Sequence, residues 1–191
     1  MRPRHLLGAA LAALVLAACQ PSASPSASEP AGSGAAVPSF VGDPELEATL
    51  PVTVEGLTFI RVSMSGPDFV EADVDQRFLD FLDALEADIE DVSVAVALGA
   101  NLDGDRTASI FAFRVQGADA DELVDEFKAT AVEGEDPLVW HPETVSGKEV
   151  EVAEPNEDFP TPIALYATGD VLYFVSASDQ PAFEAIIGRL P

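Results

Sequence analysis

The sequence predicts an α+β fold in which helices pack on one face of a mostly antiparallel sheet. Three observations support this fold class. Short β-branched runs recur along the chain, helical stretches lie between them, and many neighbouring runs are joined by turns too short for the crossovers that parallel strands need. Residues 40–191 are expected to form a single globular domain with this architecture, and a duplication within it is possible.

The expected strands are apolar runs, rich in β-branched residues and bounded by turn-forming residues. The first is LTFIRVSM at 57–64. The runs at 91–99 and 107–115 alternate with a period of two, and the ANLDGDR segment between them favours a hairpin. The strongest hairpin pattern lies at 163–178, where a Gly-Asp pair separates two runs that are apolar on both faces. These last strands are therefore expected at the centre of the sheet.

Each expected helix follows an aspartate that can cap its first turn. The clearest helix covers residues 74–88, because its apolar residues recur on one face while its acidic residues point elsewhere. The capping residues are Asp43, Asp73, Asp119 and Asp179. A proline lies in the first turn after the first and the last of them, a position that proline favours.

Two six-residue segments hint at the internal duplication. PVTVEG at 51–56 and PETVSG at 142–147 share Pro, Thr, Val and Gly in the same order. Each segment comes before an expected strand, and further along each half a hairpin is followed by an Asp-capped helix. Matches of this length also arise by chance, so both explanations stay open at this point. The fold class does not depend on the choice.

The charge of the chain is strongly negative. Nine lysine and arginine residues stand against 34 aspartate and glutamate residues, which gives a formal net charge of -25. Binding to nucleic acid needs basic side chains that displace counterions from phosphates, so nucleic acid is not expected as a partner. A well-solvated surface explains the excess of acid most simply, and adaptation to salt or capture of cations are the alternatives.

Residues 1–18 have the layout of an export signal peptide. MRPRH gives a positive start, residues 6–18 are uncharged and rich in Leu and Ala, and small residues come just before Cys19. This run is shorter than the about 20 apolar residues that a membrane-spanning helix needs. Residues 20–39 are rich in Ser, Pro, Ala and Gly and lack apolar periodicity, so the segment 19–39 is expected to be a disordered tether that begins at Cys19.

The tetrad Leu16-Ala17-Ala18-Cys19 resembles the lipobox of bacterial lipoproteins. The resemblance implies that the thiol of Cys19 receives a diacylglycerol and that the leader is cut before this residue. It also implies a lipid anchor in a membrane, with the protein on the extracytoplasmic face of a bacterial cell envelope. The alternative is that Cys19 is a small buried residue in a signal-anchor helix. The chain has one cysteine, so neither a disulfide nor a cysteine nucleophile is expected in the domain.

Candidate catalytic residues are sparse in the expected domain. A Ser-His-Asp arrangement needs an imidazole, and His141 is the only one left once His5 departs with the signal peptide. Trp140-His141-Pro142 is typical of a loop, so Trp140 and His141 are named as candidate binding residues, with ordinary loop packing as the alternative. A zinc site draws on several His or Cys ligands and is not expected, and neither is a nucleotide-binding glycine loop.

Calcium (Ca2+) is the only cofactor that the sequence suggests. Asn101, Asp103 and Asp105 alternate in NLDGD, and every second side chain can turn toward one cation. The similarity to an EF-hand loop ends at Arg106, where such a loop needs Gly, and at Ala112, where it needs Glu. Asn, Asp and Gly are also the residues that hairpin turns prefer, so a plain turn is the alternative.

The function that fits these observations best is noncatalytic binding by a lipid-anchored, extracytoplasmic domain. Its partner would be an unknown envelope protein or a small molecule. The alternatives are an envelope hydrolase on an unrecognised scaffold and a calcium-binding surface protein. A binding domain predicts a concave apolar pocket or an exposed apolar patch. A serine hydrolase instead predicts His141 within hydrogen-bonding distance of a hydroxyl and a carboxylate.

Overall fold

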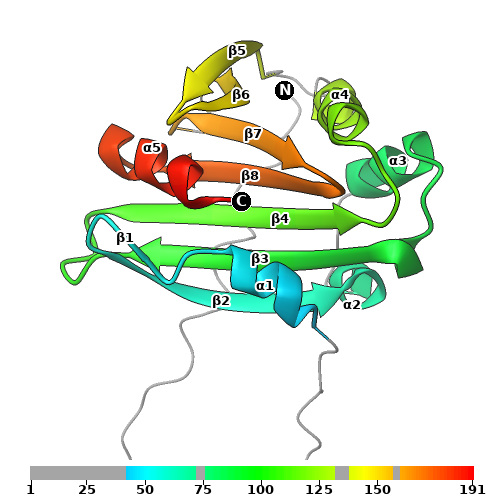
Figure 1. Cartoon of the computed structure of the whole chain (residues 1–191), viewed down its shortest axis with the longest axis horizontal. Coiled ribbons are helices and arrows are strands. Elements are labelled where there is room, and N and C mark those ends of the chain that lie inside the picture. Colours follow the sequence, from blue (N-terminus) through cyan, green and yellow to red (C-terminus); the bar gives the residue numbers. More distant parts are fainter. Residues whose placement is uncertain (1–41, 72–75, 132–137, 157–159) are drawn as a thin grey trace, which may run out of the picture. The chain divides into compact units, whose positions relative to one another are not determined.

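The structure, a computed structural model, describes residues 42–71, 76–131, 138–156 and 160–191. In this part of the chain eight strands form one antiparallel sheet in the order β1-β2-β3-β4-β8-β7-β6-β5 (Figure 1). The strands are β1 (Thr53–Val54), β2 (Leu57–Ser65), β3 (Val92–Ala100), β4 (Thr107–Val115), β5 (Trp140–Val145), β6 (Lys148–Ala153), β7 (Ile163–Thr168) and β8 (Val171–Ala177). The expected α+β class and the antiparallel sheet are confirmed.

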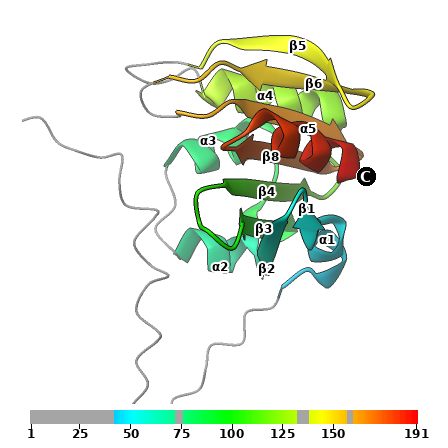
Figure 2. The same ribbon diagram turned by 90° about the vertical axis from the view of Figure 1, so that its left-hand side faces the viewer.

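Helices lie on both faces of this sheet, which corrects the expectation that they pack on one face. They are α1 (Pro44–Thr49), α2 (Gly66–Glu71), α3 (Gln76–Ala84), α4 (Ala120–Ala131) and α5 (Gln180–Arg189), with a 3-10 turn η1 at Ile89–Asp91. α1 and α5 pack on one face, whereas α2, α3 and α4 pack on the other. Figure 2 separates α2 and α3 from α1 and α5 on opposite sides of the strands.

The reason for two covered faces is that the central strands are apolar on both sides. In β8, Tyr173 faces the first core with α1 and α5, and its neighbour Leu172 faces the second core with α3 and α4. In β4, Ile110 and Phe113 divide in the same way. A strand with two apolar faces needs a cover on each, because either face left bare would expose its side chains to water.

Aspartate side chains cap the first turns of three helices, as expected. The Asp43 carboxylate accepts a hydrogen bond from the backbone N–H of Leu46 at 2.8 Å, and Asp179 accepts one from Ala182 at 3.1 Å. Asp119 accepts one from Asp121 at the start of α4. The fourth expected cap, at position 73, lies outside the described residues. The helix expected at 74–88 ends earlier than predicted, at Ala84, and Glu86 just beyond it has a positive φ of 53°. Positions 74 and 75 lie outside the described residues.

The strand order fits the suggested duplication, because β1-β2-β3-β4 from one edge of the sheet corresponds to β5-β6-β7-β8 from the other edge. The edge hairpins β1-β2 and β5-β6 contain the two similar segments, and their turns have nearly the same backbone geometry. Glu55 and Gly56 have φ values of 47° and 81°, and Ser146 and Gly147 have 52° and 82°. Inner hairpins β3-β4 and β7-β8 follow and pair through β4 and β8. The symmetry stops at the strands, since α4 and α5 pack on opposite faces.

No helix within the described residues is long and apolar enough to cross a membrane.

Candidate functional site

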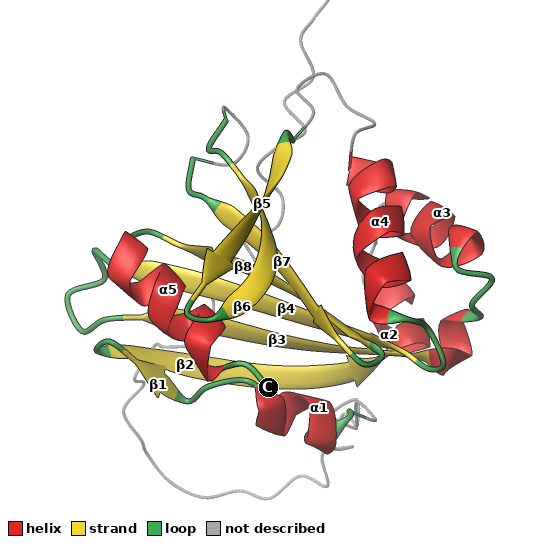
Figure 3. Ribbon diagram, turned by 45° about the horizontal axis from the view of Figure 1, so that its top comes forward, coloured by secondary structure: helices red, strands yellow, loops and turns green. Residues whose placement is uncertain are grey.

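The sheet face that carries α2, α3 and α4 is covered at only one end of the long strands. These helices gather at that end in Figure 3. Pairing across the sheet places Met64, Val94, Phe113 and Leu172 in one row beneath them. The Phe69 ring of α2 lies 6.1 Å from the Phe113 ring, measured between centroids, so the helices cover this row.

Further along the same strands, this face has no comparable cover. The register places Val62, Val96 and Phe111 in a second row, and Ile60, Leu98 and Ser109 in a third. Ile60 is 76% exposed, Leu98 49% and Val62 43%. We call the surface made by Ile60, Val62, Val96, Leu98 and Ser109 the open face. It is an uncharged, largely aliphatic strip across β2, β3 and β4.

A shallow hollow of about 360 Å³ continues the open face toward β8. Its wall is rich in hydroxyl groups, and Thr161 Oγ1 lies 2.6 Å from Ser176 Oγ. Ser176 also donates to the carbonyl oxygen of Pro162 at 3.2 Å. These hydroxyls are therefore partnered within the protein, and covering them costs less than covering unsatisfied polar groups. The lining residues include Leu98, Thr107, Ser109, Thr161, Ser176 and Ser178.

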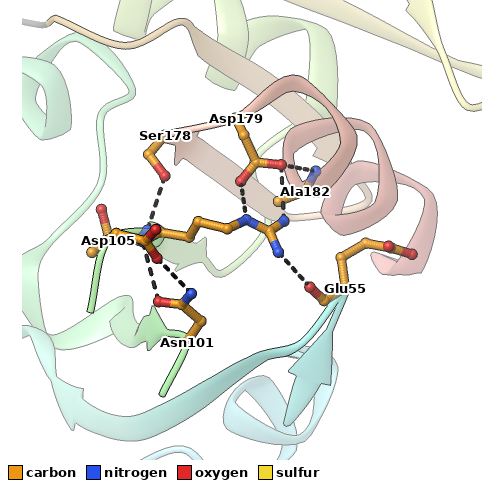
Figure 4. Close-up of polar contacts among 8 residues, drawn as sticks. Glu55, Asn101, Asp105, Ser178, Asp179 and Ala182 are labelled. Atoms are coloured by element: carbon orange, nitrogen blue, oxygen red, sulfur yellow. Dashed lines mark hydrogen bonds and ion pairs between the residues drawn. The ribbon is translucent and has the colours of Figure 1, made fainter. Parts of the chain in front are cut away.

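Arg106 lies in the β3-β4 loop, next to the strand ends that carry Leu98 and Ser109. Its partners Glu55 and Asp179 are labelled in Figure 4. The guanidinium donates two hydrogen bonds of 2.9 Å to the Asp179 carboxylate and one of 3.0 Å to the backbone oxygen of Glu55. The hydrogen bonds from Arg106 hold the pKa of Asp179 below its usual value, and the bonded carboxylate raises the pKa of Arg106. Arg106 thus ties together the β1-β2 turn, the β3-β4 loop and the start of α5.

The candidate calcium ligands lie in this same loop. Asn101 donates to the Asp105 carboxylate at 2.6 Å, and the Asn101 side-chain oxygen accepts from the backbone N–H of Arg106 at 3.2 Å. The structure thus brings Asn101 and Asp105 together, but no hydrogen bond joins Asp103 to either of them. Within the described residues no group of three or more His, Cys, Asp or Glu side chains is placed to hold a metal ion. The internal bonds of a hairpin loop account for this arrangement.

Trp140 and His141 begin the edge strand β5, which corrects the expectation that they lie in a loop. They pair with Ala153 and Val152 of β6. Since successive side chains of a strand point to opposite faces, the structure does not bring the two together. Trp140 packs against the second core, and its buried Nε1 has no hydrogen-bond partner among the described residues. β5 also lies at the edge of the sheet opposite to β1 and β2.

The described residues give His141 one side-chain hydrogen bond, between Nε2 and Glu143 Oε1 at 2.9 Å. Both side chains are substantially exposed at the sheet edge. This supplies the carboxylate that a serine hydrolase would need beside its histidine, but no hydroxyl accompanies it among the described contacts. Position 19, the expected site of lipid attachment, lies outside the described residues.

A second hollow, of about 680 Å³, lies between α4 and the strands β5, β6 and β7. Its walls carry the carboxylates of Asp121, Asp125, Glu149 and Glu151. Glu151 is already paired with Lys128 of α4 at 3.0 Å. The sequence alone predicts a well-solvated acidic surface, and the groove arises because α4 packs beside β7, which lies much later in the chain.

Sequence reasoning missed the open face. The signal that could have found it is the run LTFIRVSM, in which Leu57 and Phe59 point one way while Ile60 and Val62 point the other. Leu57 and Phe59 are buried in the first core, and Ile60 and Val62 are exposed. An apolar pattern on both sides of a strand near the sheet edge indicates either a second cover or a binding surface.

Comparisons with protein-family models, with curated proteins and with solved structures found no match to this chain.

Proposed function

We propose that the chain is a noncatalytic binding domain, held outside the cytoplasm by a lipid on Cys19, and that it binds another envelope component through the open face. The exposure of Ile60, Val62 and Leu98 as neighbours on one surface carries this proposal. Isolated apolar side chains are common on protein surfaces, but contiguous ones are typical of binding sites. Covering them contributes about 25 cal/mol for each Å² of apolar area removed from water.

The anchor half of the proposal rests on the lipobox-like tetrad that ends at Cys19 and on the signal-like segment before it. Each acyl methylene buried in a bilayer contributes about 0.8 kcal/mol, and two or more chains hold a protein durably. The tether that follows, about 20 residues long, would span roughly 25 Å on average as a flexible coil. Such a tether leaves the domain free to meet a partner away from the headgroups.

The binding half can be tested with single charges placed on the open face. Leu98→Asp and Ile60→Asp each introduce a carboxylate into the apolar strip, which an apolar partner surface would have to desolvate. Val52→Asp is the matched control, because Val52 is also exposed, at 54%, and lies outside the open face. The full acylated chain would be used to capture partners from detergent-solubilised envelopes, and each variant would be checked for folding by thermal unfolding.

The expected result is that wild type and Val52→Asp retain the same partner, while Leu98→Asp and Ile60→Asp lose it. Equal capture by all four proteins would contradict the binding role of the open face. Mass spectrometry of the protein from its native membranes tests the anchor separately. An intact leader or an unmodified Cys19 thiol would refute that part.

A further inference from the structure

The dimensions of the open face and the carboxylates beside it indicate which kind of partner it binds. This inference rests on the proposed function: we infer that the open face accepts a polypeptide segment of a partner protein, apolar at its centre and flanked by lysine or arginine. The shape of the strip argues for a segment of chain. The surrounding charge argues for the basic flanks.

The strip is long across the sheet and narrow along the strands. Neighbouring strands lie about 4.8 Å apart, so β2, β3 and β4 span roughly 10 Å, and the hollow that continues the open face to β8 extends this to roughly 14 Å. Its two rows lie about 7 Å apart, because they are two residues apart on each strand. An α-helix about 10 Å wide, or one extended segment, matches a strip of this form.

The open face is uncharged, but exposed carboxylates lie beside it. Asp103 and Asp105 are exposed in the β3-β4 loop, which directly follows the end of β3 that carries Leu98. Leu102 in the same loop is fully exposed and adds one more apolar side chain near this end of β3. A segment that rests its apolar centre on Leu98 therefore reaches an acidic rim at its end.

The basic side chains of the described residues do little to offset this rim, because several are already engaged within the protein. Arg106 is bound to Asp179, Arg114 to Asp43 at 2.6 Å, and Lys128 to Glu151. Arg61 is bound to backbone carbonyls of α1 and its cap. Much of the excess negative charge is thus not neutralised within the protein. A partner segment with lysine or arginine beside its apolar centre would complement this charge.

The same charge disfavours two other occupants. A bilayer with anionic headgroups would be repelled by a chain whose net charge is -25, and so would a second copy of the chain. Both are outcomes of the test below, and either one would overturn the inference.

The test is a selection of displayed random peptides on the full chain purified from its own membranes. Peptides that bind wild type are kept, and those that also bind Leu98→Asp are removed, with Val52→Asp as the control that must retain them. We expect the enriched peptides to combine a central apolar run with Lys or Arg on its flanks. A synthetic copy of one enriched peptide should bind about tenfold more weakly when the salt is raised from 50 to 500 mM, because salt screens exposed charges.

The outcomes separate the inference from the proposed function. Peptides that depend on Leu98 but carry acidic or neutral flanks would overturn the inference and leave the binding role of the open face intact. Failure to enrich any Leu98-dependent peptide would count against both. Sedimentation of wild type as a dimer that Leu98→Asp dissociates, or binding to anionic vesicles that Leu98→Asp abolishes, would assign the face to another occupant and also overturn the inference.

Discussion

Arg106 and Asp179 form a two-pronged ion pair that closes one end of the sheet. Nε and one terminal nitrogen of the guanidinium each donate to a different carboxylate oxygen, at 2.9 Å. The same carboxylate also caps α5, through the backbone N–H of Ala182. One aspartate therefore both starts a helix and holds the loop that borders the open face.

Replacement of Asp179 by alanine is expected to destabilise the protein more than the matching change at Asp119. Both aspartates cap a helix, and loss of a cap costs about 1 kcal/mol of unfolding free energy. Asp179 also holds Arg106, whereas Asp119 accepts its helix-start hydrogen bond from Asp121 in an exposed position. Urea unfolding of Asp179→Ala and Asp119→Ala measures the difference. Equal losses would show that the Arg106 ion pair adds nothing to the cap.

The ion pair also predicts a loss of stability in acid. The hydrogen bonds from Arg106 lower the pKa of Asp179 below its usual value of 3.8, so the folded protein binds this proton more weakly than the unfolded chain does. The Asp179 charge therefore contributes fully to the unfolding free energy above the pKa of the unfolded chain. This contribution disappears as the pH falls through the lower pKa of the folded state. Asp179→Asn keeps a capping oxygen but cannot titrate.

Urea unfolding from pH 6 down to pH 2 tests this second prediction. Wild type should lose more unfolding free energy than Asp179→Asn as the pH falls through and below about 4. The difference should shrink in high salt, which screens a partly exposed pair. Parallel pH curves for the two proteins would mean that the Asp179 charge does not stabilise the fold.

The caps at Asp43, Asp119 and Asp179 could be predicted because a cap depends only on residues close by in the chain. The alternation of 91–99 and 107–115 predicted strands for the same reason. Which faces are covered could not be predicted in this way. β8 is buried on both sides because α5, which follows it in the chain, packs on one face, while α4, from much earlier in the chain, packs on the other. Periodicity does not record on which face a helix will pack.

The candidate site also depends on long-range packing that the sequence pattern does not record. Trp140-His141-Pro142 is typical of a loop, yet an edge strand tolerates a proline whose missing N–H faces away from the sheet. The open face was missed because Ile60 and Leu98 are ordinary strand residues in the sequence. Only their register and the limited reach of the helices expose them together.

Tyr173 is expected to titrate only in strongly alkaline solution. Its burial raises the pKa of the hydroxyl above the usual 10.0, and the hydrogen bond to Thr49 at 3.1 Å only partly offsets this effect. The chain has two tyrosines, so Tyr166→Phe leaves Tyr173 as the sole phenol. Its absorbance near 295 nm should then rise at a higher pH in the folded protein than in urea.

A raised pKa in the folded state also sets the sign of the stability change. Neutral Tyr173 contributes fully to the unfolding free energy below pH about 10. This contribution is lost as the pH rises through the pKa of the folded state, because the unfolded chain releases the proton at a lower pH. Unfolding free energy should therefore fall in alkali for Tyr166→Phe and fall less when Tyr173 is also replaced by Phe. Coincident titration of folded and unfolded Tyr166→Phe would disprove the effect of burial.

Two isoleucines on opposite faces of the sheet should respond differently to substitution. Ile110 is fully buried in the first core, on the face that α1 and α5 cover, whereas Ile60 is 76% exposed on the open face. Ile110→Ala should therefore cost about 2–5 kcal/mol of unfolding free energy, and Ile60→Thr should stay within about 0.5 kcal/mol of wild type. Urea unfolding measures both. A loss of several kcal/mol for Ile60→Thr would mean that the side chain is covered in the folded protein in solution, and the open face would then be part of the core instead of a binding surface.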